Sequence, residues 1–123
     1  MSSNAPFRSG PTAITTSIAN MLNPPTLTGG VNASPPTNTF IRLTHIRVTN
    51  KTAASVAVSA WIGATGVGAA GTEFAWQSTP VGANSYLDWN GSLVLNVADF
   101  LTMSAGSNSA LTVDFEGEIG CVA

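Results

Sequence analysis

The sequence has very little charge: four basic and six acidic residues in a chain of 123, or 8%, with a net charge of -2. Soluble domains carry about a quarter charged residues, so Thr, Ser, Asn, Gly and Ala must cover much of this surface. Nucleic-acid backbones are bound by clustered Lys and Arg. Because the basic residues are only Arg8, Arg42, Arg47 and Lys51, we expect no nucleic-acid partner.

Cysteine and long apolar runs are also scarce. Cys121 alone can form no intrachain disulfide, so the fold does not depend on an oxidising compartment. No apolar run approaches the roughly 20 residues of a membrane-spanning helix, and Met1–Gly10 lacks the apolar segment of a secretory signal. We expect no membrane partner, and assembly in a cytoplasm.

Helical periodicity is almost missing. Only Ala13–Leu22 carries apolar residues four apart, and its β-branched residues favour a strand there. Further along, apolar residues recur at alternate positions, which is typical of half-buried strands. The expected strands are Phe40–Thr49, Ser55–Ile62, a short segment with Phe74 and Trp76 that Pro80 closes, Ser85–Trp89, Ser92–Val97, Asp99–Ser104 and Ala110–Ile119.

Two of these strands make local predictions. In Phe40–Thr49 the apolar phase changes between Leu43 and Ile46, which predicts a β-bulge near Thr44 or His45. Asn90–Gly91 can adopt the two positive φ angles of a type I′ turn, and this dipeptide predicts a hairpin between its flanking strands.

The last strand has the clearest alternation. Its predicted inner face consists of Leu111, Val113, Phe115 and Ile119, and its outer face of Thr112, Asp114, Glu116 and Glu118. Half of the acidic residues therefore form one row. Arg42 and Arg47 are candidate partners for that row on a neighbouring strand.

Seven or eight short strands at roughly ten-residue spacing, without an amphipathic helix, predict an all-β fold: an antiparallel β-sandwich or jelly roll. We assign residues 13–123 to one such domain and residues 1–12 to an extended N-terminal arm. A Pro- and Gly-rich loop spans residues 23–38. The scarcity of Lys on its strand edges indicates that neighbouring chains cover them, which predicts a homo-oligomer.

The arm and the loop are the candidate interface, because free termini and long surface connections of this kind usually contact partners. The candidate interface residues are Phe7, Arg8, Pro24, Pro25, Pro35 and Pro36.

Three motifs allow catalytic or ligand-binding interpretations. Gly66–Gly71 matches the dinucleotide-binding spacing, but no helix follows it, so we interpret it as a flexible loop. His45 could act as a general base, yet nothing specifies a partner, and a structural role is favoured. Asp114, Glu116 and Glu118 lie about 7 Å apart along one strand, too far to hold a metal ion without other ligands.

We therefore expect no enzyme activity, no catalytic or metal site and no cofactor. One further alternative comes from the aromatic residues, which could form a sugar-stacking platform but more often pack in cores and interfaces. They are Trp61, Trp76, Trp89, Tyr86 and Phe74.

Three segments, Leu43–Asn50, Val81–Ser85 and Leu93–Leu101, followed by the alternating last strand, resemble small tailed-bacteriophage virion proteins. The pattern is similar to that of β-sandwich head decoration (cement) proteins, in which a strand ending in Thr-Asn precedes a small-residue strand. The likeness covers roughly residues 40–119.

The resemblance implies a structural protein of the virion, assembled in the host bacterial cytoplasm and located on the capsid surface. It would act as a dimer or trimer between capsomers, bound to the major capsid protein or another virion protein. A head-to-tail connector, tail or baseplate component is the alternative within this class. A carbohydrate- or receptor-binding module is the alternative from another class.

Overall fold

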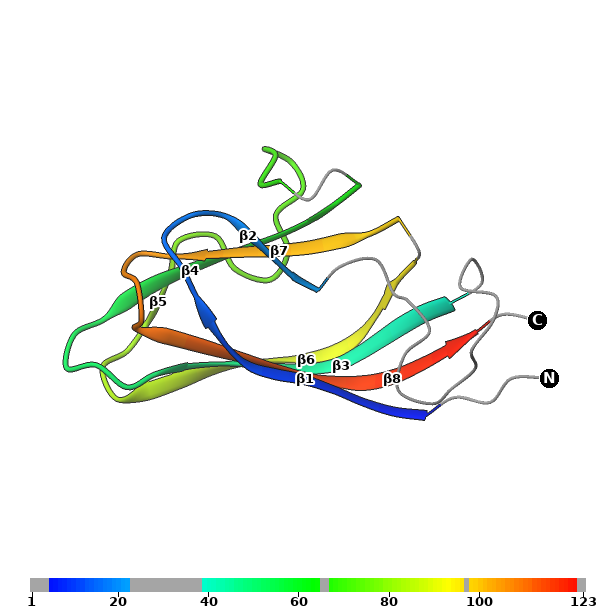
Figure 1. Ribbon diagram of the computed structural model, residues 1–123. Helices are drawn as coiled ribbons and strands as arrows, with labels where there is room; N and C mark the ends of the chain where they lie inside the picture. Colours follow the sequence, from blue (N-terminus) through cyan, green and yellow to red (C-terminus); the bar gives the residue numbers. More distant parts are fainter. Residues whose placement is uncertain (1–4, 23–38, 65–66, 97, 122–123) are drawn as a thin grey trace.

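The computed structural model describes residues 5–22, 39–64, 67–96 and 98–121 (Figure 1). Eight strands and no helix occur in this part of the chain. They are β1 (Ala5–Ile14), β2 (Ala19–Leu22), β3 (Thr39–Asn50), β4 (Val56–Gly63), β5 (Thr79–Val81), β6 (Ser85–Leu95), β7 (Phe100–Ala105) and β8 (Leu111–Cys121).

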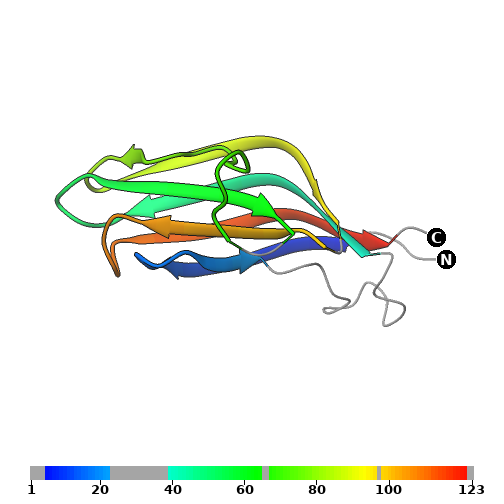
Figure 2. The same cartoon turned by 90° about the horizontal axis from the view of Figure 1, so that it is seen from above.

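The strands form two four-stranded sheets that face each other (Figures 1 and 2). Sheet I has the order β1-β8-β3-β6, sheet II has the order β2-β7-β4-β5, and every pairing is antiparallel. The chain crosses between the sheets at every connection except β4 to β5. This strand order is that of a jelly roll, and it confirms the predicted all-β sandwich.

The core lies between the sheets and is built from the alternate apolar residues of nearly every strand. Its largest fully buried side chains are Ile14, Leu43, Ile46, Val48, Val58, Val81, Leu95, Leu101, Met103, Leu111, Val113 and Phe115. The inward set predicted for the last strand is confirmed, since its members are all buried.

The predicted bulge in β3 is confirmed at Thr44. Leu43 pairs with Gly117 of β8 and His45 with the next residue, Glu116. Thr44 is therefore an extra residue in β3 that has no partner in β8. In the pairing with β6 the extra residue lies in β6 instead, because Leu43 pairs with Leu93 and His45 with Asn90. The register therefore shifts on both sides of β3 at the same level.

The predicted hairpin at Asn90–Gly91 is wrong, because both residues lie inside β6. This strand pairs with β3 over almost its whole length, and the long ladder outweighs the local turn preference. Gly91 lies instead where the register of β6 shifts, and it leaves room for the Trp89 ring, because a Cβ there would lie 2.9 Å from that ring.

The arm predicted for residues 1–12 is corrected from residue 5 onward. The segment is extended, but Ala5–Ile14 pairs with β8 of its own chain, so the expected boundary between residues 12 and 13 falls inside a strand. Phe7 lies opposite Gly117 and packs against the core. Ala13–Leu22, predicted as one strand, contains the end of β1, a bend and β2.

The strand predicted around Phe74 and Trp76 is also corrected. These residues lie in an irregular segment that hydrogen-bonds to Ala60 of β4, with Phe74 N–H donating at 2.8 Å and the Trp76 carbonyl accepting at 3.0 Å. The regular strand is β5, which includes Pro80. Proline is tolerated there because β5 is an edge strand.

We expect Gly117→Ala to destabilise the protein strongly. A Cβ at this position would collide with the carbonyl oxygen of Arg42, in the backbone of the adjacent strand. Overpacking of this kind costs about 1 to 3 kcal/mol in the free energy of unfolding, which urea denaturation measures. Gly63→Ala in β4 is the control, since nothing lies within 4 Å of a Cβ there. Equal stability of the two variants would contradict the proposed close approach.

Candidate functional site

The charged residues are divided unequally between the two sheets. Sheet I carries seven of the ten, together with the single histidine, whereas the strands of sheet II carry none. The sheet I residues are Arg8, Arg42, His45, Arg47, Asp88, Asp114, Glu116 and Glu118. The other three, Lys51, Glu73 and Asp99, lie between strands. The outer face of sheet I is therefore the candidate site.

His45 is the centre of this face. The bulge at Thr44 turns its ring outward between β8 and β6, where Nδ1 lies 2.9 Å from Glu116 Oε1 and Nε2 lies 2.9 Å from Asp88 Oδ1. Hydrogen bonds to Glu116 and then to Asp88 raise the pKa of His45 above 6.5, against the opposing effect of burial. A protonated ring donates to both carboxylates and links three strands.

Asp88 also receives Arg47. The guanidinium donates from Nε to Oδ1 at 2.8 Å and from Nη2 to Oδ2 at 2.9 Å, the two-point geometry that suits a carboxylate. Hydrogen bonds from Arg47 and His45 lower the pKa of Asp88 from 3.8 to about 2, although burial acts in the opposite direction. The same guanidinium lies over the Tyr86 ring, 4.2 Å from its centroid.

Arg42 and Arg47 were predicted to pair with the acidic row of β8. Arg42 does so, with Nε 3.6 Å from Glu118 Oε1. For Arg47 the prediction is wrong: it lies opposite Asp114 in the β3–β8 register, but its ion pair is with Asp88 on the other neighbouring strand. Asp88 could not be predicted from the sequence, because one acidic residue in an alternating segment gives no signal.

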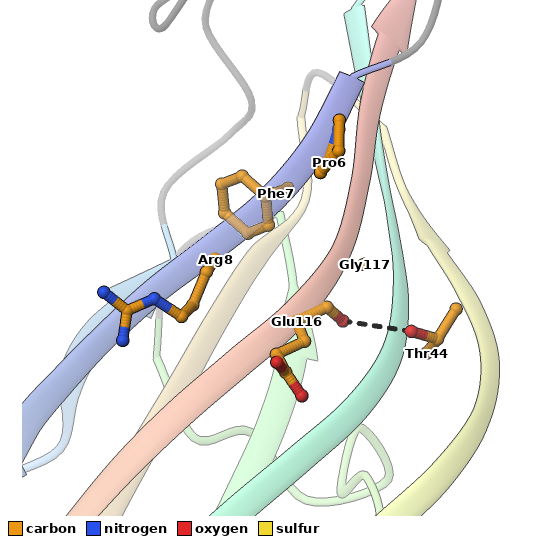
Figure 3. A pocket seen from close by; sticks show the side chains of 6 residues that line it. All are labelled: Pro6, Phe7, Arg8, Thr44, Glu116 and Gly117. Atoms are coloured by element: carbon orange, nitrogen blue, oxygen red, sulfur yellow. Dashed lines mark hydrogen bonds between the residues drawn. The ribbon is translucent and has the colours of Figure 1, made fainter.

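Two open hollows lie on this face. One of about 450 Å³ is lined by Pro6, Phe7, Arg8, Thr44, Glu116 and Gly117, and the Thr44 hydroxyl donates to the Glu116 carbonyl at 3.4 Å beside it (Figure 3). The other, of about 210 Å³, is lined by Arg8, His45, Arg47, Asp114 and Glu116.

Neither hollow has the geometry of a hydrolytic triad. Both nitrogens of His45 are held by carboxylates, so neither is placed to take a proton from a serine or threonine hydroxyl. In the acidic row, Glu116 is engaged by His45 and Glu118 by Arg42. In the described segments, no three His, Cys, Asp or Glu side chains are grouped so as to hold a metal ion.

The aromatic residues pack rather than form a platform. Trp61 and Trp76 are buried, and Phe74 meets Trp89 edge to face with ring centroids 5.1 Å apart. Tyr86 is exposed under Arg47. The packing interpretation is therefore confirmed for Trp61, Trp76, Phe74 and Trp89, and Tyr86 is the exception.

Two of the six candidate interface residues, Phe7 and Arg8, lie in the part of the chain that the structure describes. Arg8 is exposed on the outer face of sheet I, whereas Phe7 is half-buried against the core. The four prolines, Pro24, Pro25, Pro35 and Pro36, and the loop 23–38 lie outside the described residues. Of the glycine motif, residues 67–71 are described and form no helix.

Sequence reasoning missed the apolar surface beside sheet II. Ile18 is 45% exposed and Val67 is 53% exposed. Gly68, next to Val67 in the chain, lies against Ile18 and Trp61: a Cβ there would lie 2.8 Å from Ile18 and 2.9 Å from the Trp61 ring, on the outer side of β4. The loop containing Val67 rises over sheet II in Figure 1. The sequence signal that could have indicated this surface is the lack of charged residues in the four strands of sheet II.

Comparison with known proteins identifies no family. No family model matches the chain, and no curated protein matches it. Among solved structures, that of infectious bursal disease virus Gt strain aligns with 98% of this chain at 9% identity and a TM-score of 0.24. The match spans 30% of that chain. Likeness at this level supports no conclusion about this protein. The described residues include no helix of the length and apolarity needed to cross a membrane.

The single histidine permits a test of the charged network by pH. Its raised pKa means that its stabilising effect is fully present below 6.5 and is lost as pH rises through the raised value. We therefore expect the free energy of unfolding of the wild type to fall, relative to that of His45→Gln, between about pH 6 and pH 8.

Urea denaturation in small pH steps measures this difference. The Asp88 effect does not interfere, because its lowered pKa gives stability that is present above 3.8 and is lost only as pH falls through about 2. Parallel stability curves for the two proteins from pH 6 to 8, steps that bracket the ordinary histidine pKa of about 6.5, would show that the two carboxylates do not hold His45.

Proposed function

We propose that the protein is a non-enzymatic structural protein of a tailed-phage virion, a decoration or cement protein that binds between capsomers and stabilises the head. Its partner is the major capsid protein or another virion protein, and it acts as an oligomer on the capsid surface. Assembly takes place in the host bacterial cytoplasm. The sequence resemblance introduced this assignment, and the separation of charge between the sheets carries it further.

The side of the sandwich formed by sheet II is poor in charge, which is the composition of a docking surface. Interface centres are depleted in charged residues. The strands of sheet II contain none, although Glu73, which forms a β-bridge with Trp61 of β4, and Asp99, which precedes β7, border them. On that side Ile18 is exposed and lies beside Gly68, the neighbour of the exposed Val67. We assign sheet II and the loop over it to the contact with the shell.

The charged side suits exposure to solvent. On sheet I, Arg47 and His45 are joined to Asp88 and Glu116 within the same chain. Such internal pairing leaves few charges that need an outside partner, while it keeps a polar face toward water. A protein that binds only the assembled shell stabilises that shell by mass action.

The alternatives differ in location and ligand. A connector, tail or baseplate component could use the same charge-poor face. A carbohydrate- or receptor-binding module needs exposed aromatics, and four of the five candidate aromatic side chains are buried or half-buried here. Electron microscopy of purified particles separates these cases. We expect density for the sandwich at regular sites on the head exterior; density only at the tail or connector, or none, would refute the assignment.

We expect Val67→Lys to reduce head occupancy, because it places a charge in the proposed contact surface at a side chain that is already 53% exposed. Thr112→Lys, on the exposed face of sheet I, is the matched control and should bind normally. Binding of the purified variants to heads that lack the protein measures both. Equal loss of binding, or no loss with Val67→Lys, would contradict the assignment of sheet II to the shell contact.

A further inference from the structure

The four edge strands of the sandwich are unequally protected against pairing with another chain. β2 has four residues, and β5 has three, one of them Pro80. β1 is longer but carries Pro6 and Pro11. Short edges and prolines prevent edge-to-edge association.

β6 lacks these protections. It has 11 residues without Pro or Lys, and Asp88 is its single charged residue. It ends sheet I beside β3 and follows one long side of the molecule (Figure 2). No described segment pairs with its outer edge. A long exposed edge of this kind is a template for another strand.

We propose that β6 pairs antiparallel with β6 of a second copy of this chain, about a two-fold axis at Asn90. Sheet I then continues across the axis as one eight-stranded sheet. This inference specifies the self-association included in the function proposed above. It can be tested on the purified protein, and its failure would leave the location on the virion undecided.

The side chains of β6 favour this register. Its outward residues are Tyr86, Asp88, Asn90, Ser92 and Val94, all of them exposed. Two of these are large and apolar: Tyr86 is 53% exposed and Val94 is 36% exposed. They stand four residues on either side of Asn90, so the two-fold axis places each Tyr86 opposite Val94 of the partner subunit. Each covers the other, and this apolar pair occurs twice.

Charge excludes a competing register. Outward residues meet outward residues only when the strand shifts in steps of two. A shift of four residues, which centres the axis on Asp88, would place two carboxylates opposite each other, which is unfavourable. A shift of two centres the axis on Trp89 or Gly91 and no longer places Tyr86 opposite Val94. With the axis at Asn90, Asp88 lies opposite Ser92 of the partner subunit. Within one chain, the Ser92 hydroxyl already accepts from Arg42 Nη1 at 2.9 Å, so the new neighbour of Asp88 lies beside a cation.

Tyr86 is held in place before any association. Arg47 lies over its ring at 4.2 Å and is fixed in turn by two hydrogen bonds to Asp88. A held aromatic side chain loses little conformational freedom on binding, which favours it as an interface anchor. Since edge pairing buries a small area, we expect a weak, concentration-dependent dimer.

The first test is analytical ultracentrifugation of the full chain across the micromolar range. We expect a monomer–dimer equilibrium in the wild type. Val94→Lys should raise the dissociation constant at least about tenfold, because it places a cation opposite Tyr86 and Arg47 of the partner subunit. Val67→Lys, the same change at an exposed valine of the other sheet, should leave the equilibrium unchanged. A wild type that stays monomeric, or equal effects of both variants, would overturn the proposal.

The second test determines the register and does not require Val94→Lys to fold. In a Cys121→Ser background, Asn90→Cys should form an intermolecular disulfide under mild oxidation, because the two Cα atoms lie about 5 Å apart across the axis. Ser92→Cys should not, since its two copies are about 13 Å apart along the strands. Crosslinking through position 92 and not through position 90 would show that the register is wrong.

Discussion

The extra residue at Thr44 is the constraint on which the rest of sheet I depends. In an uninterrupted strand, alternation would bury either Ile41 and Leu43 or Ile46 and Val48, but not both pairs. All four are buried, so β3 must change phase between them. The bulge makes this change in the middle of the sheet, where both neighbouring strands must adjust to it. Gly117 permits the close approach of β8 to Arg42, and Gly91 takes up the surplus residue of β6 beneath the Trp89 ring. The core and these two glycines are therefore linked through one residue.

The same phase change builds the charged face. Without it, His45 would point toward the core, where a protonated ring has no partner. With it, His45 faces outward between Glu116 of β8 and Asp88 of β6, and Arg47, two residues further, reaches the same Asp88. Each hydrogen bond to a charged group crosses from one strand to the next, so the network joins the three strands whose register the bulge disrupts. The ion pair between Arg42 and Glu118 lies on the other side of the bulge and is longer, at 3.6 Å. It contributes less to holding the sheet together.

The sequence was informative where one signal acted alone. The alternation of Leu111, Val113 and Phe115 and the phase change in β3 were both predicted correctly, because burial on one face decides strand register. Prediction failed where a local preference competed with long-range pairing. Asn90–Gly91 suits a tight turn, yet it is spanned by the ladder with β3. Residues 5–12 have few apolar side chains and two prolines, but β8 supplies a strand partner that composition cannot reveal.

The site was only partly predictable for the same reason. The acidic row and its arginines could be identified, but Asp88 joins them only through the order of strands in the sheet.

The low charge of the chain is therefore not a uniform property of its surface. Sheet I needs its charged residues because its outer face is polar, and the bulge requires side chains that tie neighbouring strands together there. In sheet II the pairing of the central strands β7 and β4 is regular, the register shifts where the edge strand β2 meets β7, and the strands carry no charge. A monomer in water gains nothing from having so little charge on one face, since charged side chains oppose association. The division becomes favourable when one face is exposed and the other is covered. Low total charge and uneven placement are thus two consequences of the same asymmetry between the sheets, and that asymmetry fits a protein that works at a surface.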